Sequence, residues 1–301
     1  MWFNFNVMLP AFKTVALIGR YNTAEIAESL LDLAELLRQR GCAVLIEKET
    51  AANIGKNVGK NGFQTADYAV IGGQADLAVV LGGDGSMLSA ARHLAVHGVP
   101  LVGVNQGRLG FMTDIAFSRM RETIELLLSG SYTIGERTML EARVLRAEKE
   151  IFSIQALNDI VVNKGGTGRM IEFLVHIDGQ FVYDLRADGI IVATPTGSTA
   201  YALSSNGPIL QPNVPGIALV PVCPHTLSNR PITVSDRCVV EISIKRRAVG
   251  ARLHVDGQPY SELAAEDRVV VRRAANSIRF VHPPGYSYYA MLREKLHWSE
   301  M

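Results

Sequence analysis

Residues 76–98 have the sequence DLAVVLGGDGSMLSAARHLAVHG, which combines three local patterns. Residues 76–81 are almost entirely apolar, which is typical of a strand buried on both faces of a parallel sheet. Residues 86–97 carry apolar side chains at helical spacing, and Gly98 follows as a helix stop. A glycine-rich turn joins the two. This unit of strand, turn and helix predicts an α/β domain.

Similar units lie on either side of this stretch. We expect strands at residues 14–19, 43–46 and 101–104, and helices at 22–40 and 118–128. Residues 48–62, which include GKNVGKNG, are predicted to form a loop. The alternation of strands and helices predicts a first domain at residues 1–138, with a parallel sheet between helices.

The hydrophobic pattern changes to a period of two in the second half of the chain. Val240, Ile242 and Ile244 alternate with polar residues, and Asp-Gly pairs at 178–179 and 256–257 are typical hairpin turns. These features predict an all-β domain at residues 139–283, folded as a β-sandwich. Residues 288–298 are helical in pattern, and we expect residues 284–301 to pack back on the first domain.

The composition excludes several classes of protein. The 301 residues contain 30 Lys and Arg against 29 Asp and Glu, so no basic surplus favours binding to nucleic acid. No apolar run reaches the ~18 residues of a membrane span, and residues 1–12 lack the features of a signal peptide. Three scattered cysteines predict neither disulfides nor a zinc knuckle. We therefore expect a cytoplasmic protein with no membrane or nucleic-acid partner.

The glycine-rich turn at residues 82–86 is a candidate phosphate-binding loop. Gly82, Gly83 and Gly85 would let a ligand approach the backbone, and the helix that starts near Ser86 offers free N–H groups. Asp84 is unusual there, because a carboxylate repels a phosphate. It therefore suggests a group that accepts a proton or helps to hold a metal ion. A helix cap in a tight turn is the alternative interpretation.

Several common catalytic motifs are absent. The sequence has no GxxxxGK[ST], no GxGxxG after a strand and no GxSxG, which argues against a P-loop enzyme, a dehydrogenase and a hydrolase. His93 and His97 have the spacing of a zinc pair, but no third ligand accompanies them. We interpret them as ordinary histidines.

A second polar stretch, YDLRADGIIVATPTGSTAYALSSNGP, covers residues 183–208. Its hydroxyl groups suit a polar ligand, and Tyr201 could stack on a ring, although a plain connection between strands would have a similar composition. Asn158 and Asp159 come just before a predicted strand and either bind a ribose or an amide group or form a turn. Residues 164–169, KGGTGR, fit a phosphate-contacting loop or a linker equally well.

Taken together, these motifs resemble the NAD kinase family of the bacterial type. The matching stretches are GGDGSML at 82–88, NQGRLGF at 105–111, Asn158-Asp159 and residues 188–208, within a similarity that spans residues 14–290. The resemblance implies a Rossmann-like α/β domain followed by a β-sandwich. It also implies transfer of the terminal phosphoryl group of ATP to the 2′-hydroxyl of the adenosine ribose of NAD, giving NADP. The family contains enzymes that use polyphosphate, so the donor stays open.

The resemblance also assigns roles to residues. Asp84 would accept the proton of the hydroxyl, and Phe111 would lie near the adenine. The other positions that would contact NAD are Gly85, Asn158, Asp159, Arg169, Arg186, Asp188, Thr199, Ala200, Tyr201, Ala202, Leu203, Ser204 and Gln258. Mg²⁺ or another divalent cation would neutralise the triphosphate of ATP, with ligands that the sequence does not identify. A homodimer or homotetramer is implied as well.

Two other functions fit part of the sequence. Lipid kinases carry a similar glycine loop, but they need an apolar groove or a basic membrane-facing patch, of which the near-neutral charge gives no sign. A sensor that binds NAD without chemistry is the other alternative. It would gain nothing from the Asp84 carboxylate beside phosphates.

Overall fold

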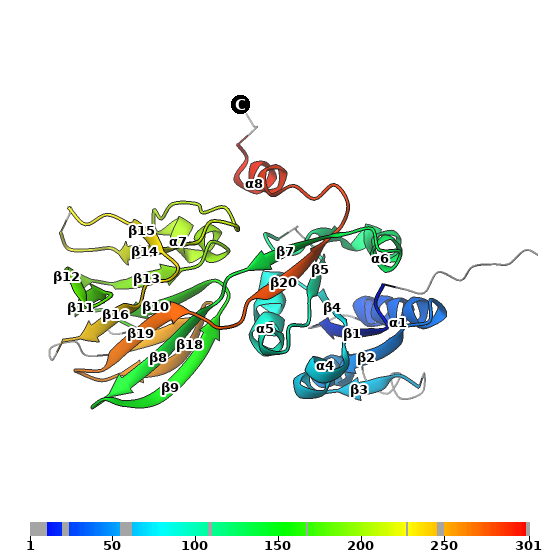
Figure 1. Ribbon diagram of the computed structural model, residues 1–301, viewed down its shortest axis with the longest axis horizontal. Coiled ribbons are helices and arrows are strands. Elements are labelled where there is room, and N and C mark those ends of the chain that lie inside the picture. The colour runs from blue at the N-terminus through cyan, green and yellow to red at the C-terminus, as the bar shows by residue number, and fades with distance from the viewer. Residues whose placement is uncertain are drawn as a thin grey trace, which may run out of the picture. The chain divides into compact units, whose positions relative to one another are not determined.

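The computed structural model describes residues 11–19, 24–54, 62–107, 110–166, 168–226, 228–245 and 250–298. The chain divides into two compact units (Figure 1). The first unit contains Met1–Gly135 and Ile278–Met301, and the second contains Glu136–Ser277. An α/β unit with a parallel sheet and an antiparallel all-β unit confirm the predicted fold class.

The first unit is built on a sheet in which, within the described residues, eight strands are joined. Their order is β3-β2-β1-β4-β5-β20-β7, with β6 paired to β5. The strands are β1 (Thr14–Gly19), β2 (Ala43–Glu47), β3 (Gln64–Ala66), β4 (Leu77–Leu81), β5 (Leu101–Asn105), β6 (Ile115–Ala116), β7 (Thr133–Arg137) and β20 (Ile278–His282). The helical segments are α1 (Ala24–Gln39), α2 (Lys48–Ile54), α4 (Tyr68–Gln74), α5 (Asp84–Leu94), η1 (Ala95–His97), η2 (Phe117–Arg119), α6 (Met120–Leu128) and α8 (Tyr288–Leu296).

The centre of this sheet is buried on both faces. Every residue of β4 and β5 is buried, and β1 pairs in parallel with β2 and β4. On one side, Leu30, Leu33 and Leu37 of α1 belong to the same core cluster as the strands. Parallel strands need crossover helices, which cover both faces of the sheet and explain the continuous apolar runs in the sequence.

Residues 48–54, which we expected in a loop, form helix α2. The Glu47 carboxylate accepts hydrogen bonds from the backbone N–H groups of Glu49 and Thr50, each at 2.8 Å, and so satisfies donors at the start of the helix. The Thr50 hydroxyl also contacts Gly19 of β1. Residues 55–61 of the expected loop lie outside the described residues.

Strand β20 lies in the first unit, whereas our domain boundaries placed residues 278–283 in the second. It pairs in parallel with β5, with Phe280 opposite Leu101. Exposed Arg279 between buried Ile278 and Phe280 resembles the alternating strands of the second unit and differs from the continuous apolar runs of β4 and β5. The pattern therefore does not identify β5 as the partner strand. After β20, α8 begins with the Ser287 hydroxyl accepting from the N–H of Ala290 and belongs to the first unit.

The second unit consists of two antiparallel sheets, as predicted. Their orders are β15-β14-β13-β10-β17-β18 and β12-β11-β16-β19-β8-β9. The first contains β10 (Asp159–Asn163), β13 (Gly189–Ala193), β14 (Gly216–Val222), β15 (Ile232–Ser235), β17 (Ala251–Val255) and β18 (Gln258–Leu263). The second contains β8 (Leu140–Arg146), β9 (Lys149–Ala156), β11 (Ile171–Ile177), β12 (Gln180–Ala187), β16 (Val240–Ile244) and β19 (Arg268–Arg273). Two short helical turns, η3 (Gly197–Thr199) and α7 (Tyr201–Ser204), follow β13.

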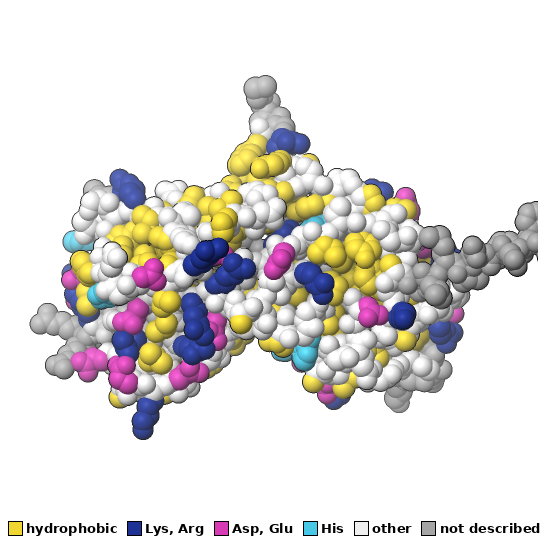
Figure 2. Space-filling view, in the orientation of Figure 1, with side chains coloured by type: hydrophobic (Ala, Val, Ile, Leu, Met, Phe, Trp, Pro, Cys, Tyr) yellow, Lys and Arg dark blue, Asp and Glu magenta, His cyan; other side chains and the backbone are white. Residues whose placement is uncertain are grey.

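The two sheets enclose one apolar core. The alternating residues Val240, Ile242 and Ile244 are buried in it, together with Ile190 and Val192 of the facing sheet. On the outer face of the second sheet, many of the alternate positions are charged, and Glu141 pairs with both Arg143 and Arg272. Figure 2 shows acidic and basic side chains intermixed over this unit. None of the helices among the described residues is both long enough and apolar enough to span a bilayer.

Candidate functional site

The glycine loop connects the carboxyl end of β4 to α5, which is the position where open α/β sheets bind ligands. Gly82 has a φ of +158°, and a Cβ there would lie 2.5 Å from the Ser86 hydroxyl oxygen. A side chain at 82 would therefore force Ser86 to move. Nothing lies within 4 Å of a Cβ built at Gly83 or Gly85, so the outer side of the loop is open to a ligand.

Asp84 is the first residue of α5, and Gly83 occupies the cap position without a side-chain cap. The Asp84 carboxylate instead accepts hydrogen bonds from the backbone N–H groups of Phe111 and Met112, each at 3.0 Å. Asp84 is half-buried. The alternative role of capping its own helix is therefore not the role that the carboxylate has in the structure.

The segment that holds Asp84 is itself held by a buried polar group that the motif analysis did not assign. The Thr113 hydroxyl accepts from the N–H of Gly110 at 3.0 Å and from the Asn105 side-chain amide at 2.9 Å. A Cβ built at Gly110 would overlap Asp84 Oδ1. The close approach of residues 110–112 to Asp84 thus depends on glycine at 110. Arg108 and Leu109 lie outside the described residues.

In the second unit, Asn158 and Asp159 lie where β9 leads into β10, and both are buried. The carboxylate of Asp256 accepts from three successive backbone N–H groups: Leu157 at 3.2 Å, Asn158 at 2.7 Å and Asp159 at 3.2 Å. The Thr194 hydroxyl donates to the carbonyl of Leu157 at 2.6 Å. Asp256 and Thr194 are residues that sequence reasoning did not select for this site.

Burial disfavours charge on two side chains of this group. It raises the pKa of the Asp159 carboxyl from 3.8 to about 7, and the neighbouring charge of Asp256 adds to the effect. Burial also lowers the pKa of His254, with nearby Arg252 contributing. Both groups are therefore biased toward their neutral forms, which can exchange hydrogen bonds with a polar ligand without a large desolvation cost.

Asp159 and His254 lie in the wall of a cavity of about 390 Å³. It is lined by Asn158, Asp159, Val161, Asn163, Ala200, Tyr201, His254, Asp256 and Gly257. Within the part of the chain that is described, Asn158 Oδ1 and His254 Nε2 are buried and have no hydrogen-bond partner. Buried polar atoms are nearly always paired, so two unpaired ones in the wall of one cavity indicate a binding site for a polar ligand.

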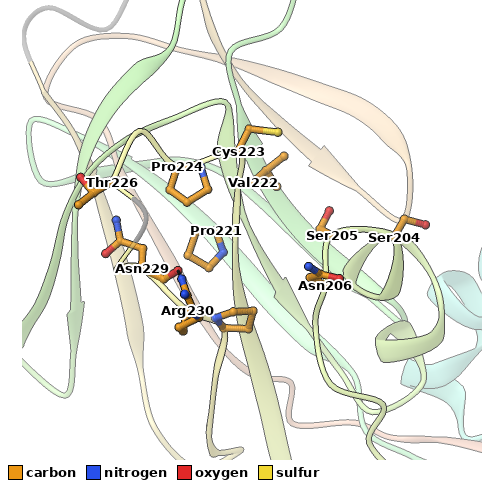
Figure 3. A pocket seen from close by; sticks show the side chains of 11 residues that line it. Ser204, Ser205, Asn206, Pro221, Val222, Cys223, Pro224, Thr226, Asn229 and Arg230 are labelled. Carbon is orange, nitrogen blue, oxygen red and sulfur yellow. Dashed lines mark hydrogen bonds between the residues drawn. The ribbon is translucent and has the colours of Figure 1, made fainter.

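A second cavity, of about 550 Å³, lies beside the end of α7 (Figure 3). Ser204, Ser205 and Asn206 form one wall, and Pro221, Val222 and Cys223 at the end of β14 form another. Tyr201 of the same helix lines the first cavity; burial raises the pKa of its phenol, and the nearby Cys223, Asp188 and Asp159 side chains add to that shift. The polar stretch of residues 197–206 therefore borders both cavities.

The remaining predicted site residues are more dispersed. Asp188 pairs with Lys164 at 2.8 Å, which brings part of the undecided segment 164–169 to the predicted site. Thr199 donates its hydroxyl to the carbonyl of Thr196, and Ala202 is packed in the core beneath α7. Leu203 is half-buried and lines neither of these two cavities. Arg169, Arg186 and Gln258 are exposed and also line neither cavity.

No group of three His, Cys, Asp or Glu side chains among the described residues is arranged to hold a metal ion. His93 stacks on Tyr68, with ring centroids 4.2 Å apart. The described part of the chain thus offers no site of its own for a cation held by protein side chains alone.

Comparison with known proteins identifies the family. The model of the ATP-NAD kinase N-terminal domain matches residues 15–132, and that of the ATP-NAD kinase C-terminal domain matches residues 157–283. An NAD kinase of Aromatoleum aromaticum is 56% identical over 99% of this chain and 98% of its own length. An NAD kinase of Bordetella parapertussis is 50% identical over 96% of this chain and 97% of its own length.

Solved structures agree with this comparison. A yeast NADH kinase complexed with NADH has a TM-score of 0.87 and 25% identity, covering 97% of this chain and 89% of that one. An NAD kinase from Archaeoglobus fulgidus in complex with ATP has a TM-score of 0.73 and shares the fold at 21% identity, covering 94% of this chain and 98% of that one. The resemblance inferred from the motifs is confirmed, and the chain belongs to the NAD kinase family of enzymes.

Proposed function

We propose that this enzyme transfers the terminal phosphoryl group of ATP to the 2′-hydroxyl of the adenosine ribose of NAD, producing NADP. The observation that carries the proposal is the position and the hydrogen bonding of the Asp84 carboxylate. Its carboxylate lies at the carboxyl end of β4, is half-buried, and is oriented by the N–H groups of Phe111 and Met112. Each oxygen accepts one hydrogen bond, which leaves each with capacity to accept another from a substrate hydroxyl.

Asp84 would act as the reaction proceeds and not before it. A carboxylate is a far weaker base than an alkoxide, so it cannot remove a proton from a free alcohol. It can orient the hydroxyl and take its proton while the ribose oxygen bonds to the terminal phosphorus and the bond to the leaving oxygen of ADP breaks. The two backbone hydrogen bonds favour this role because they hold the acceptor in one orientation.

The phosphates of ATP would bind at the glycine loop. The start of α5 offers N–H groups that have no partner one turn earlier in the helix, at Gly83 and Gly85, whereas the N–H of Ser86 donates to the carbonyl of Gly83. The open space around Gly83 and Gly85 supports close approach of a phosphate. The complex of the Archaeoglobus fulgidus relative with ATP supports ATP as the donor.

The polar cavity of the second unit would bind NAD. Asn158, Asp159, Ala200 and Tyr201 line it, and the unpaired Asn158 Oδ1 supports a ligand rich in hydroxyl groups. The complex of the yeast relative with NADH agrees with a dinucleotide ligand. Contacts of NAD with Gly85, Phe111, Arg169, Arg186, Asp188, Thr199, Ala202, Leu203, Ser204 and Gln258 stay predictions.

The divalent cation would enter with the triphosphate of ATP. Mg²⁺ is commonly bound through substrate phosphates with only one or two carboxylates, which suits a chain whose described residues have no cluster of metal ligands. Its chemistry would be neutralisation of phosphate charge. Assembly as a homodimer or homotetramer and a cytoplasmic location also stay predictions.

The test is the Asp84→Asn variant, with Asp76→Asn as its matched control. Asp76 also accepts from two backbone N–H groups, those of Lys13 and Thr14 at 2.9 Å, but it lies before β4. We expect Asp84→Asn to form NADP at about a hundredth of the wild-type kcat or less, with NAD binding changed only a few-fold. The control should behave as wild type.

Two outcomes would contradict the proposal. Retention of more than about a tenth of kcat in Asp84→Asn would remove the proton-accepting role. Wild-type enzyme that makes no NADP from Mg-ATP and NAD, but phosphorylates a lipid alcohol or only binds NAD, would favour the lipid kinase or the sensor.

A further inference from the structure

Asp256 is a buried carboxylate that the proposed reaction does not use. It occupies the turn between β17 and β18, and 8% of its surface is exposed. Its two oxygens accept the N–H groups of Leu157, Asn158 and Asp159, and its own N–H donates to the carbonyl of Asp159 at 3.0 Å. Four hydrogen bonds therefore join one residue to a segment of three residues.

The geometry points to Asp256 as a positioning residue that holds residues 157–159, so that Asn158 and Asp159 line the NAD-binding cavity. This inference rests on the proposed function. Successive N–H groups point to opposite sides of an extended strand, so three that converge on one carboxylate define a specific local turn. Bonds from N–H groups to a charged acceptor are also stronger than bonds between neutral groups.

The same carboxylate sets the charge of the cavity. The titratable groups that line the cavity together with Asp159 are Asp256 from the β17–β18 turn, His254 from β17 and Tyr201 from α7. Asp256 adds to the raised pKa of Asp159, after burial. Removal of the charge at 256 would ease the ionisation of Asp159, and this effect separates positioning from a general loss of stability.

The test compares Asp256→Asn with Asp178→Asn. Asp178 occupies the corresponding Asp-Gly turn between β11 and β12, with a φ of +49° against +48° for Asp256. Its carboxylate accepts from the N–H of Val239 at 2.8 Å, and Val239 directly precedes β16, which lies in the same sheet as β11 and β12. The two variants thus make the same chemical change in the same kind of turn, and only one affects residues 157–159.

For Asp256→Asn we expect the KM for NAD to rise by about ten-fold or more, because three charge-assisted hydrogen bonds are weakened. The KM for ATP and kcat should stay within about three-fold of wild type. Amide hydrogen exchange at residues 157–159 should accelerate, and the limb of the pH profile of kcat/KM for NAD that reports Asp159 should move to lower pH. Asp178→Asn should change none of these.

An Asp256→Asn enzyme with the KM and exchange rates of Asp178→Asn would overturn the inference, as would faster exchange with an unchanged KM. If Asp256→Asn does not fold, Asp256→Glu is the second variant, because it keeps the negative charge but displaces it. Asp256→Glu should raise the KM for NAD without moving the limb of the pH profile that reports Asp159. An unchanged KM for NAD would again overturn the inference. A wild-type enzyme that makes no NADP would refute the proposed function instead, and the exchange measurement would still report on Asp256.

Discussion

Replacement of Asp159 by Asn should stabilise the enzyme at neutral and alkaline pH. Only 3% of the Asp159 surface is exposed, and burial raises its pKa from 3.8 to about 7. Because the pKa is higher in the folded state than in the unfolded state, the folded state binds more protons between these two values. The free energy of unfolding therefore falls as the pH rises through this window, and the loss is complete above the folded pKa.

The size of the effect follows from the two pKa values. One pKa unit corresponds to 1.36 kcal/mol, so the difference between 3.8 and about 7 amounts to roughly 4 kcal/mol at pH 8. Asparagine resembles the protonated carboxyl and does not ionise. The variant should therefore match wild type near pH 4 and exceed it by about 4 kcal/mol near pH 8, or roughly 10 °C in Tm for a domain of this size.

Thermal unfolding of both proteins between about pH 4 and pH 8.5 provides the measurement, with NAD absent. Asp178→Asn removes the same charge from an exposed turn and serves as the control for net charge. A gap between Asp159→Asn and wild type that stays constant over the whole pH range would refute the reasoning. The stabilised variant should also have a higher KM for NAD, since the ionisable carboxyl is a proposed binding group.

Two further variants test the surroundings of the site. Gly110→Ala should lower kcat by about ten-fold or more, because a Cβ there overlaps Asp84 Oδ1 and lies 2.7 Å from Thr113 Oγ1. Gly73→Ala is the control in the same steady-state assay, because a Cβ at Gly73 of α4 has open space around it. Equal kcat values for the two variants would be inconsistent with the role of residues 110–112. Asp188→Ala should mainly raise the KM for NAD, because it breaks the ion pair with Lys164 and removes a predicted binding group; an unchanged KM in initial-rate measurements would exclude Asp188 from the site.

The central sheet was predictable because burial leaves a strong local signal. All five residues of β4 are buried, and so are all five of β5, so each strand had to be apolar throughout. Helix α2 was not predictable in this way, since its start is stabilised by Glu47, a residue at the end of the preceding strand. Strand β20 was assigned to the wrong domain because its partner, β5, precedes it by more than 170 residues.

The two Asp-Gly turns show the same limit at the level of the site. Both were predicted as hairpin turns, and both have the positive φ values that such turns require. The carboxylate of Asp178 accepts from the N–H of Val239, whereas that of Asp256 accepts from residues 157–159, nearly 100 residues earlier in the chain. Two identical local motifs therefore differ in what their side chains contact, and only the tertiary structure distinguishes them.

Asp84 and Asp256 both accept hydrogen bonds from successive backbone N–H groups, but these bonds have a different purpose at each residue. At Asp84, two N–H groups hold a carboxylate that would react. At Asp256, a carboxylate holds three N–H groups, two of which belong to the proposed substrate-binding residues Asn158 and Asp159. The partners in both cases are backbone groups, which every residue except proline provides. A motif search can therefore find the acidic residue but not the segment that it contacts. This explains why the glycine loop and the Asn-Asp pair indicated the family, while the contacts of Gly110, Thr113 and Asp256 became visible only in the folded chain.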